Sequence, residues 1–450
     1  MSKKLFNEFS EVSFKEWKQK IQADLKGADY NDTLIWKTNE GIDIKPIYHA
    51  DEFTSLPNVS NSKATQWQIC ETIFVSDVKK SNHQAKEYLN KGVQSIKFIV
   101  PSENISIVSL LYGIDLDETQ LFFELQFISS DYVKQLSERT SKEKTIILID
   151  IIGNLAKSGN WFTNLQEDHT QFEVIVNTTS TINIDLSLYQ NAGATMVQQL
   201  AYTLAHTNEY LNHLKNKESI LVIFNVSVGT NYFFEIAKLR ALRILWKTLA
   251  SEYGITSDCH IFASPTKRNK TLYDYNTNLL RTTTECMSAI LGGADTINNL
   301  AYDALYHKTN EFGNRISRNQ LLVLKHESYF DKVNNPANGT YYIESLTQQL
   351  AKKALELFKD IEKNGGFLKQ LKDGIIQRKI KESADKEQAQ FNNGEEVLLG
   401  TNKHPNPNDK MKNELELYPF VKTNIRKTLV EPIIEKRLAE TLEQNRLKTE

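Results

Sequence analysis

The chain has 450 residues, of which 24% are charged and 40% hydrophobic, and its formal net charge is -2. This length suits one large α/β barrel with extensions, and the near-neutral charge argues against nucleic acid or an anionic membrane as a partner. The three scattered cysteines, Cys70, Cys259 and Cys286, favour a reducing, cytoplasmic location. The N-terminus lacks the apolar core of a signal peptide, and the most apolar run, 146–152, is too short to span a bilayer.

Residues 1–66 are predicted to form a helix followed by an irregular, extended arm. Ser13 is placed to cap the helix, with Glu16 three residues later as in a capping box, and Gly27 is placed to end it. An apolar stripe follows the helical period: Phe14, Trp17, Ile21 and Leu25. Such a helix on a long arm packs either on its own barrel or on a partner, and the sequence leaves both possibilities open.

Strand-like and helical runs alternate between about residues 67 and 345, which predicts a parallel sheet covered on both faces. The strands expected are Ser95–Val100, Leu121–Phe127, Thr145–Ile151, Phe172–Asn177, Ile182–Leu188, Ile220–Val228 and His260–Ala263. The helices expected are Ala194–Lys215, Tyr232–Tyr253, Asn276–Leu291 and Asn314–Ser328. A closed (β/α)8 barrel of the TIM type fits this length better than an open sheet, and we place it at residues 67–375.

The remaining segment, 376–450, is predicted to be a helical and loop linker. A helix at Leu346–Asn364 precedes it and ends at Gly365-Gly366, and residues 392–412 have the Asn, Gly and Pro content of a loop. A last, mostly polar helix is expected from Glu431 to about Arg446.

Several polar residues have spacings that suggest sites. His206 and His213 lie seven residues apart on one helix, about 10 Å, which is too far to share a zinc ion, and we expect both to be solvated. Gly229, in a turn before a helix, is a candidate for offering free N–H groups to a phosphate, against the simpler interpretation of a tight connection. In that helix Glu235 and Lys238 can pair at i,i+3.

Arg281 and Glu285 lie at i and i+4 on one helix. The simpler interpretation is an ion pair on the helix surface. The sharper hypothesis is that they bind an anionic ligand or cofactor, and they are the two weak cofactor-binding candidates of the chain.

The run Ile182–Leu188 enters a turn at Asn191-Ala192-Gly193. In a parallel α/β protein the end of such a strand is where chemistry is usually placed. The side chains there are Ser187 and Leu188, and no good acid, base or nucleophile is nearby. This strand end therefore has the position of an active site without a reactive group.

Four segments together resemble the barrel domain of methylmalonyl-CoA mutase: "FNVSVGTNYFFEIAKLRALRILW", "YNTNLLRTTTECMSAILGGADTI", "RISRNQLLVLKHES" and "VNNPANGTYYIESLT". They occur in the order of that family and cover most of residues 10–375. The resemblance implies a (β/α)8 barrel whose axis admits the pantetheine arm of an acyl-CoA. It also implies adenosylcobalamin on a separate flavodoxin-like domain and a radical rearrangement between succinyl-CoA and (R)-methylmalonyl-CoA.

The resemblance breaks at the positions that carry the family's chemistry. Where catalytic chains have a Tyr-His pair and then Glu-Ala-Gly-Ala, this chain has Ser187, Leu188 and Asn191. Thr72 stands at a tyrosine that guides radical formation. Ala263 and Pro265 stand at the His and Gln of a later strand, with Ser264 between them. Leucine cannot donate a hydrogen bond, so we expect no catalytic residue on this chain. We also expect no metal site.

The resemblance therefore implies a non-catalytic small subunit that pairs as a heterodimer with a catalytic large mutase subunit. Adenosylcobalamin is expected on the large subunit and no cofactor on this chain. The segment 376–450 resembles the linker that precedes the cobalamin domain, which is not in this sequence, and 1–66 is the candidate for wrapping the partner. Two alternatives stay open: the barrel subunit of another acyl-CoA mutase with a separate cobalamin subunit, and an acyl-CoA-binding or assembly module.

Overall fold

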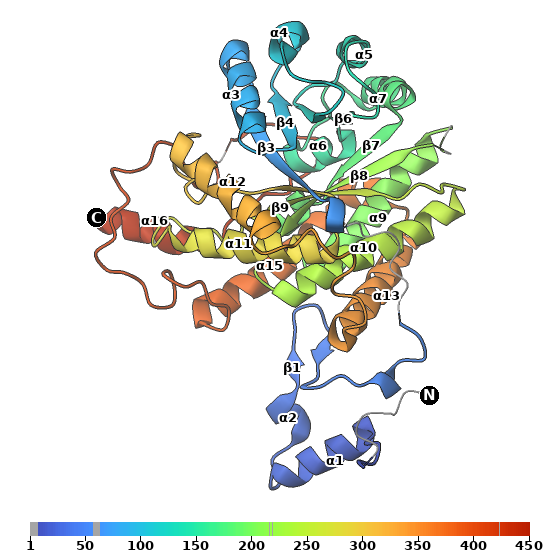
Figure 1. The fold of residues 1–450 in the computed structure, drawn as a ribbon, viewed down its shortest axis with the longest axis vertical. Coiled ribbons are helices and arrows are strands. Elements are labelled where there is room, and N and C mark those ends of the chain that lie inside the picture. The colour runs from blue at the N-terminus through green and yellow to red at the C-terminus, as the bar shows by residue number, and fades with distance from the viewer. Residues whose placement is uncertain (1–7, 57–63, 216, 218, 423) are drawn as a thin grey trace.

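The protein is built around an eight-stranded parallel sheet (Figure 1), seen in a computed structural model that describes residues 8–56, 64–215, 217, 219–422 and 424–450. The strand order is β6-β5-β4-β3-β10-β9-β8-β7. The end strands β6 and β7 lie in contact, so the sheet is nearly closed into a (β/α)8 barrel, as predicted. The strands are β3 (Gln68–Phe74), β4 (Ser95–Val100), β5 (Gln120–Leu125), β6 (Thr145–Leu148), β7 (Thr181–Asp185), β8 (Leu221–Val228), β9 (His260–Pro265) and β10 (Thr296–Asn298).

Helices surround the barrel and bury the outward-facing residues of the strands. Alternate residues of β4, such as Ile96 and Phe98, join one large outer core with the helices, because successive side chains of a strand point to opposite faces. The helices of the barrel region are α3 (Val78–Asn90), α4 (Ile107–Leu111), α5 (Ser130–Ser137), α6 (Ile151–Ser158), α7 (Leu165–Thr179), α8 (Ser187–Asn191), α9 (Met196–His213), α10 (Tyr232–Glu252), α11 (Thr277–Gly292), α12 (Glu311–His326) and α13 (Tyr341–Lys363).

Gly292 permits the close packing of α10 and α11. A Cβ atom at this position would lie 2.9 Å from Leu239 Cδ1 and 3.3 Å from Ile236 Cα, both on α10. Contacts this short do not occur between real side chains, so any larger residue would force the two helices apart. The Gly292-Gly293 pair of the sequence therefore has a packing role as well as ending α11.

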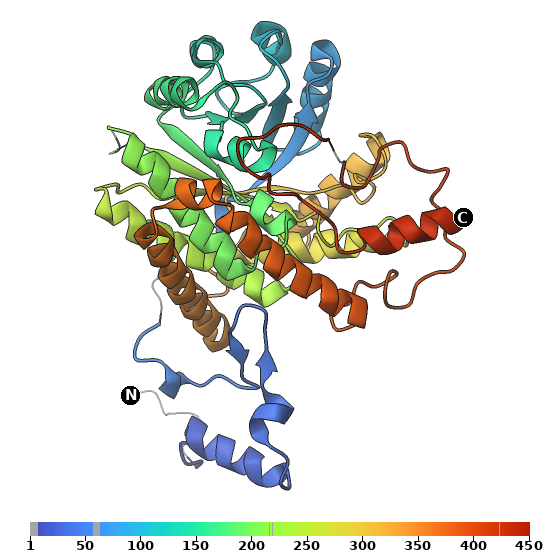
Figure 2. The ribbon, with the colours of Figure 1, turned by 180° about the vertical axis from the view of Figure 1, so that it is seen from behind.

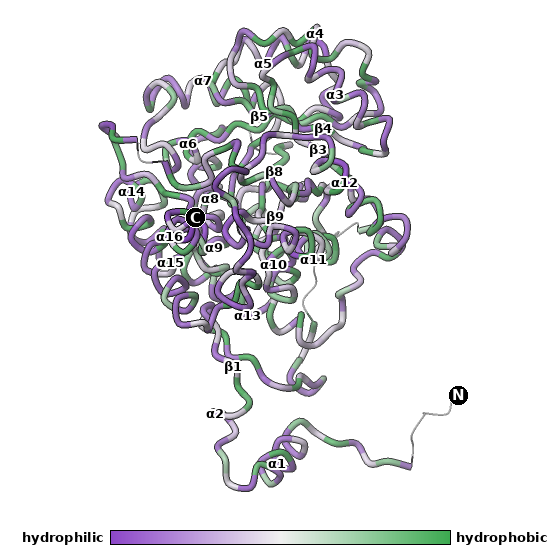
Figure 3. The backbone as a smooth tube through the Cα atoms, turned by 90° about the vertical axis from the view of Figure 1, so that its left-hand side faces the viewer, coloured by the Kyte–Doolittle hydropathy of each residue, from purple (hydrophilic) through white to green (hydrophobic). Residues whose placement is uncertain are grey.

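The N-terminal arm divides into an outer part and a part that docks on the barrel. The outer part contains α1 (Phe14–Asp24), which begins with the predicted capping box of Ser13 and Glu16, and α2 (Tyr30–Leu34). Both lie away from the barrel (Figures 1 and 2), and Figure 3 shows hydrophobic residues of α1 at a distance from the core. The docked part is the antiparallel hairpin β1 (Trp36–Lys37) and β2 (Asp43–Ile44).

The C-terminal region returns to the barrel. After α14 (Phe367–Lys372) and α15 (Ile375–Asn393), an irregular segment leads to α16 (Glu440–Thr449). The stretch 429–438, which we call the C-terminal strap, runs along the loops that follow β6, β7 and β9. Its backbone N–H groups donate to the carbonyls of Gly159, Ala156, Asn191 and Arg268. The helix expected from Glu431 is thus wrong for its first nine residues, 431–439: the N–H groups of Ile433, Lys436 and Leu438 donate to the barrel, and α16 begins only at Glu440.

Two further predictions of secondary structure differ from the structure. Phe172–Asn177 is not a strand but part of α7, where Phe172, Ile175 and Val176 are buried on one helical face. Strands β3 and β10 were not among those expected from the sequence. β3 contains Glu71 and Thr72, which interrupt its apolar run, and β10 has only three residues.

All three cysteines are buried and free, so the odd count does not conceal a disulfide. Within the described ranges, every helix is too short or too polar to cross a bilayer.

Candidate functional site

The carboxyl ends of the strands form the face where a barrel of this type carries its chemistry. β7 ends here at Asp185, and the chain turns directly into α8. The carboxylate of Asp185 accepts hydrogen bonds from the backbone N–H of Ser187, at 3.0 Å, and from its hydroxyl. Burial raises the pKa of Asp185, and the charge of Lys157 only partly offsets this effect. Asp185 therefore fixes the backbone and the side chain of Ser187 at the end of β7.

Leu188 and Asn191 lie on α8 and have structural partners. Leu188 is 2% exposed and belongs to the outer core. Asn191 Oδ1 accepts hydrogen bonds from the Thr266 hydroxyl at 2.7 Å and from the Lys267 N–H at 3.0 Å, and its amide donates to Glu435 of the strap at 2.9 Å. Asn191 thus ties three segments together, and both acceptor positions of its carbonyl oxygen are used.

The structure separates the other predicted positions. Thr72 faces the barrel interior from β3 and donates to Asn298 of β10 at 2.9 Å. Ala263 is fully buried in the outer core, on the helix side of β9, and by strand alternation Pro265 shares that side. The inward-facing residues of β9 are His260, Phe262 and Ser264, so Ala263 and Pro265 do not join Thr72 inside the barrel.

The barrel axis is filled by apolar side chains. Six buried residues from five strands form a separate cluster inside the sheet: Cys70, Phe122, Ile146, Leu148, Ile223 and Phe262. The rings of Phe122 and Phe262 meet edge to face with their centroids 5.1 Å apart, and burial raises the pKa of the Cys70 thiol to about 12. An axis open to a pantetheine arm, which the resemblance implies, is thus not observed, because these side chains occupy it.

Above this cluster lies a group of paired charges that the sequence did not single out. Lys97 Nζ is 3.1 Å from Glu124 Oε2, and it also lies over the Phe262 ring at 5.1 Å. The charge of Lys97 lowers the pKa of Glu124 despite burial. Lys157 pairs at 3.6 Å with Glu435. In the sequence, Lys97 and Glu124 could have been noticed as charged residues within otherwise apolar strands. Glu435 could not, because it reaches Lys157 from a segment that is distant in sequence.

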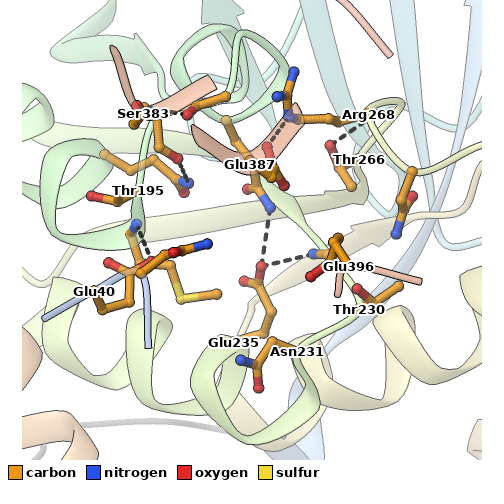
Figure 4. A pocket seen from close by; sticks show the side chains of 18 of the residues that line it. Glu40, Thr195, Thr230, Asn231, Glu235, Thr266, Arg268, Ser383, Glu387 and Glu396 are labelled. Atoms are coloured by element: carbon orange, nitrogen blue, oxygen red, sulfur yellow. Dashed lines mark hydrogen bonds and ion pairs between the residues drawn. The ribbon is translucent and has the colours of Figure 1, made fainter. Parts of the chain in front are cut away.

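A second candidate is a pocket of about 200 Å3 between the arm, α9, α10 and α15 (Figure 4). Several of its charged side chains have partners within the chain. Arg268 Nε lies 2.6 Å from Glu387 Oε2. Glu40 of the arm accepts hydrogen bonds from the N–H groups of Met196 at 2.8 Å and Val197 at 2.9 Å. A carboxylate of the chain itself therefore occupies the start of α9, a position that favours anions.

Gly229 has the simpler of its two interpretations, a tight connection, and not the candidate phosphate role. Its N–H donates to Glu235 Oε1 at 2.8 Å, so it is not free for a ligand. The predicted i,i+3 pair is confirmed: Lys238 Nζ lies 2.6 Å from Glu235 Oε2. Both side chains are buried, and Lys238 also donates to Gln190 and to the carbonyl of Ser227, so this network supports the wall of the pocket.

Arg281 and Glu285 do not form the expected surface pair. Both are buried. Glu285 pairs with Lys270 at 2.8 Å, while Arg281 donates to the Thr271 hydroxyl at 2.9 Å and to the Leu399 carbonyl at 2.7 Å. The surface prediction fails because tertiary partners, brought in by the loop after β9, compete with the local one.

The expectation of solvated histidines is half wrong. His213 is exposed, but His206 is fully buried, with Nε2 2.9 Å from Asp150 Oδ1 and Nδ1 3.0 Å from the Tyr189 hydroxyl. Within the described residues, His, Cys, Asp and Glu nowhere gather in a group able to hold a metal ion. The buried histidine has a structural role that no local pattern indicated.

Comparisons with known proteins show the family of this chain. The family model described as methylmalonyl-CoA mutase matches residues 132–447. A methylmalonyl-CoA mutase small subunit from Porphyromonas gingivalis is 34% identical, over 90% of this chain and 71% of its own length. Methylmalonyl-CoA mutases from Rhizobium meliloti and Bos taurus are 28% and 26% identical, over 89% and 86% of this chain and 65% and 60% of their own lengths. The chain thus spans about two thirds of these relatives, and it belongs to the methylmalonyl-CoA mutase family.

Proposed function

We propose that this chain is the non-catalytic small subunit of a heterodimeric, adenosylcobalamin-dependent methylmalonyl-CoA mutase. The large subunit would carry out the isomerisation between succinyl-CoA and (R)-methylmalonyl-CoA and would bind the cofactor. The observation that carries the proposal is the filled barrel axis, with Phe122 and Phe262 in contact at its centre. The name of the small subunit from Porphyromonas gingivalis supports the same assignment.

The residues at the barrel mouth do not fit adenosylcobalamin. The C-terminal strap runs along the loops after β6, β7 and β9, and its Val430 and Ile433 are buried in the outer core. Asn191 is engaged by Thr266, Lys267 and Glu435, and Leu188 offers no hydrogen bond. These contacts support placing the cofactor on the partner, and we derive no chemical step through it on this chain.

The N-terminal arm, 1–66, is the proposed partner-binding element. The hairpin is anchored to the barrel through Glu40, and Trp36 contacts Phe234 edge to face. The helix α1 carries its apolar stripe without burying any residue fully. An anchored arm whose outer helix keeps an incompletely covered apolar face is suited to wrapping a second subunit.

The decisive experiment is size-exclusion chromatography with mass detection, on the chain alone and co-expressed with the large mutase subunit from the same source. We expect a stable one-to-one complex. The purified chain should give no methylmalonyl-CoA turnover with added adenosylcobalamin, whereas the complex should be active. Turnover by the chain alone, above a heat-killed control, would favour the barrel subunit of another acyl-CoA mutase. If the chain forms a homodimer, does not associate with the large subunit and binds acyl-CoA, the alternative of an acyl-CoA-binding module would be favoured.

A further inference from the structure

Arg318, on α12, differs from the other buried arginines of the described chain. Five of them donate at least one hydrogen bond to a protein acceptor: Arg240, Arg243, Arg268, Arg281 and Arg437. Arg318 is only 3% exposed, yet none of the described residues accepts a hydrogen bond from it. A buried guanidinium with five donors and no acceptor is unusual, because each unmade bond costs free energy.

The nearest carboxylate only weakly compensates this charge. Glu71 Oε1 lies 3.6 Å from Arg318 NH1, beyond hydrogen-bond distance. Burial raises the pKa of Glu71 to about 8, although the charge of Arg318 opposes the shift. Burial thus disfavours the charged form of Glu71, and at 3.6 Å it does not accept a hydrogen bond from Arg318.

Arg318 lines a pocket of about 270 Å3 between α3 and α12. The Tyr88 ring forms another part of the wall and lies 5.4 Å from the guanidinium carbon. The Tyr88 hydroxyl accepts hydrogen bonds from the side-chain amides of Gln84 and Asn314, and its own proton has no acceptor among the described residues. Burial also raises the pKa of Tyr88, so this hydroxyl remains a donor at neutral pH.

Most charged side chains at the rim of this pocket are paired with one another, and one cation among the described residues is not. Lys91 is paired with Glu87, and Glu311 lies 3.7 Å from Arg315. Lys80 is exposed, lines the same pocket and has no ion pair within the described residues. Arg318, Lys80 and the Tyr88 hydroxyl thus line one cavity, and none of the described residues accepts a side-chain hydrogen bond from them; Glu71, 3.6 Å from Arg318, is the one carboxylate paired with either cation in the described chain.

We propose that this pocket binds a small oxyanion with the chemistry of phosphate, held by the Arg318 guanidinium and the Tyr88 hydroxyl, with the Lys80 ammonium at the rim. A guanidinium suits such a ligand because its planar donors match two oxygens of a tetrahedral oxyanion. The site lies outside the barrel, between two helices, so it is separate from the partner role proposed above.

The test is isothermal titration of the full chain with sodium phosphate, against sodium chloride at the same ionic strength. Phosphate should bind and chloride should not.

Tyr88→Phe removes one hydroxyl and keeps the ring beneath Arg318, so the variant should fold normally and bind phosphate about tenfold more weakly. Lys80→Ala should weaken binding and reduce its salt dependence. Lys79→Ala is the matched control: Lys79 is exposed on the same helix but does not line the pocket, and binding should be unchanged.

A second titration, with methyl phosphate, separates the two sources of the ligand. Tighter binding of the monoester indicates the phosphoryl group of a larger molecule, and equal or weaker binding indicates free phosphate. The proposal is overturned if phosphate gives no more heat than chloride, or if Tyr88→Phe and Lys80→Ala both bind phosphate as the wild-type chain does.

Discussion

The carboxylate of Asp150 accepts a hydrogen bond from the backbone N–H of Asp185, 3.0 Å away, and so links the two end strands of the sheet. Asp150 follows β6 and Asp185 ends β7. The same carboxylate accepts from the Gly153 N–H at 2.7 Å and from the Tyr210 hydroxyl at 2.7 Å, and it lies 2.9 Å from His206. One buried side chain therefore closes the barrel where the strands themselves form no ladder within the described residues.

The first prediction concerns this closure and its pH dependence. Burial works to raise the pKa of Asp150, but His206, the Asp185 N–H and Tyr210 more than offset it, so the pKa lies below its usual value. The stabilisation is present above the pKa of the unfolded chain and is lost as pH falls through the folded-state pKa. Asp150→Asn should reduce the free energy of unfolding at pH 7 by about 3 kcal/mol, since an amide cannot accept all the hydrogen bonds that the carboxylate accepts from Asp185, Gly153 and Tyr210.

Urea unfolding of both chains between pH 7 and pH 2 tests this. The difference between wild type and variant should shrink in acid. The control is Asp131→Asn, whose side chain is 84% exposed and whose loss should cost less than about 0.5 kcal/mol. A wild-type advantage that stays constant with pH would contradict the assignment.

The second prediction concerns the filled axis. Phe122 is fully buried at its centre, so Phe122→Ala should lower the free energy of unfolding by about 3–5 kcal/mol. The enlarged interior should not give the isolated chain mutase turnover, because no acid or base is added. Phe312→Ala, at a side chain that is 50% exposed, is the control and should change stability by less than about 1 kcal/mol. Turnover by the Phe122 variant would show that the side chains in the barrel axis, and not the missing acid or base, prevent catalysis.

The third prediction separates the arm from the barrel. Deleting residues 1–28 removes α1 but keeps α2, whose Tyr30 is buried, and the β1–β2 hairpin. The melting temperature of the barrel should change little, because α1 contributes no buried residue. The affinity for the large subunit should fall, as measured by titration of the purified partner. Unchanged affinity would exclude these residues from the interface.

The fourth prediction concerns the anchor of the arm. Glu40→Ala removes the acceptor for the Met196 and Val197 N–H groups, and the loss of a helix cap costs about 1–2 kcal/mol. Hydrogen exchange in the hairpin should therefore be faster. Asn39→Ala is the matched control, since exposed Asn39 bonds only the Gln390 side chain and should have a smaller effect. Equal protection in the Glu40 variant and the wild type would refute an anchoring role.

Local patterns predicted the elements whose signals lie within one segment. β4 has the predicted bounds, and α10 and α11 lie within one residue of theirs. The prediction of a strand at Phe172–Asn177 was wrong because the aromatic and β-branched residues there favour a strand, although their spacing also fits one face of a helix. The strap was mistaken for a helix because its partners, Gly159, Ala156 and Asn191, lie far away in sequence.

The sequence by itself determined the alternation of strands and helices, the family and the presence of Ser187, Leu188 and Asn191 at the end of β7, because these are properties of single segments. Only the tertiary structure decided that the axis is filled, that His206 is buried against Asp150, and that Arg318 lacks an acceptor. Each of these depends on side chains from strands or helices distant in sequence, which meet only when the sheet closes. Their burial and pairing therefore follow from the closed barrel and not from any local spacing.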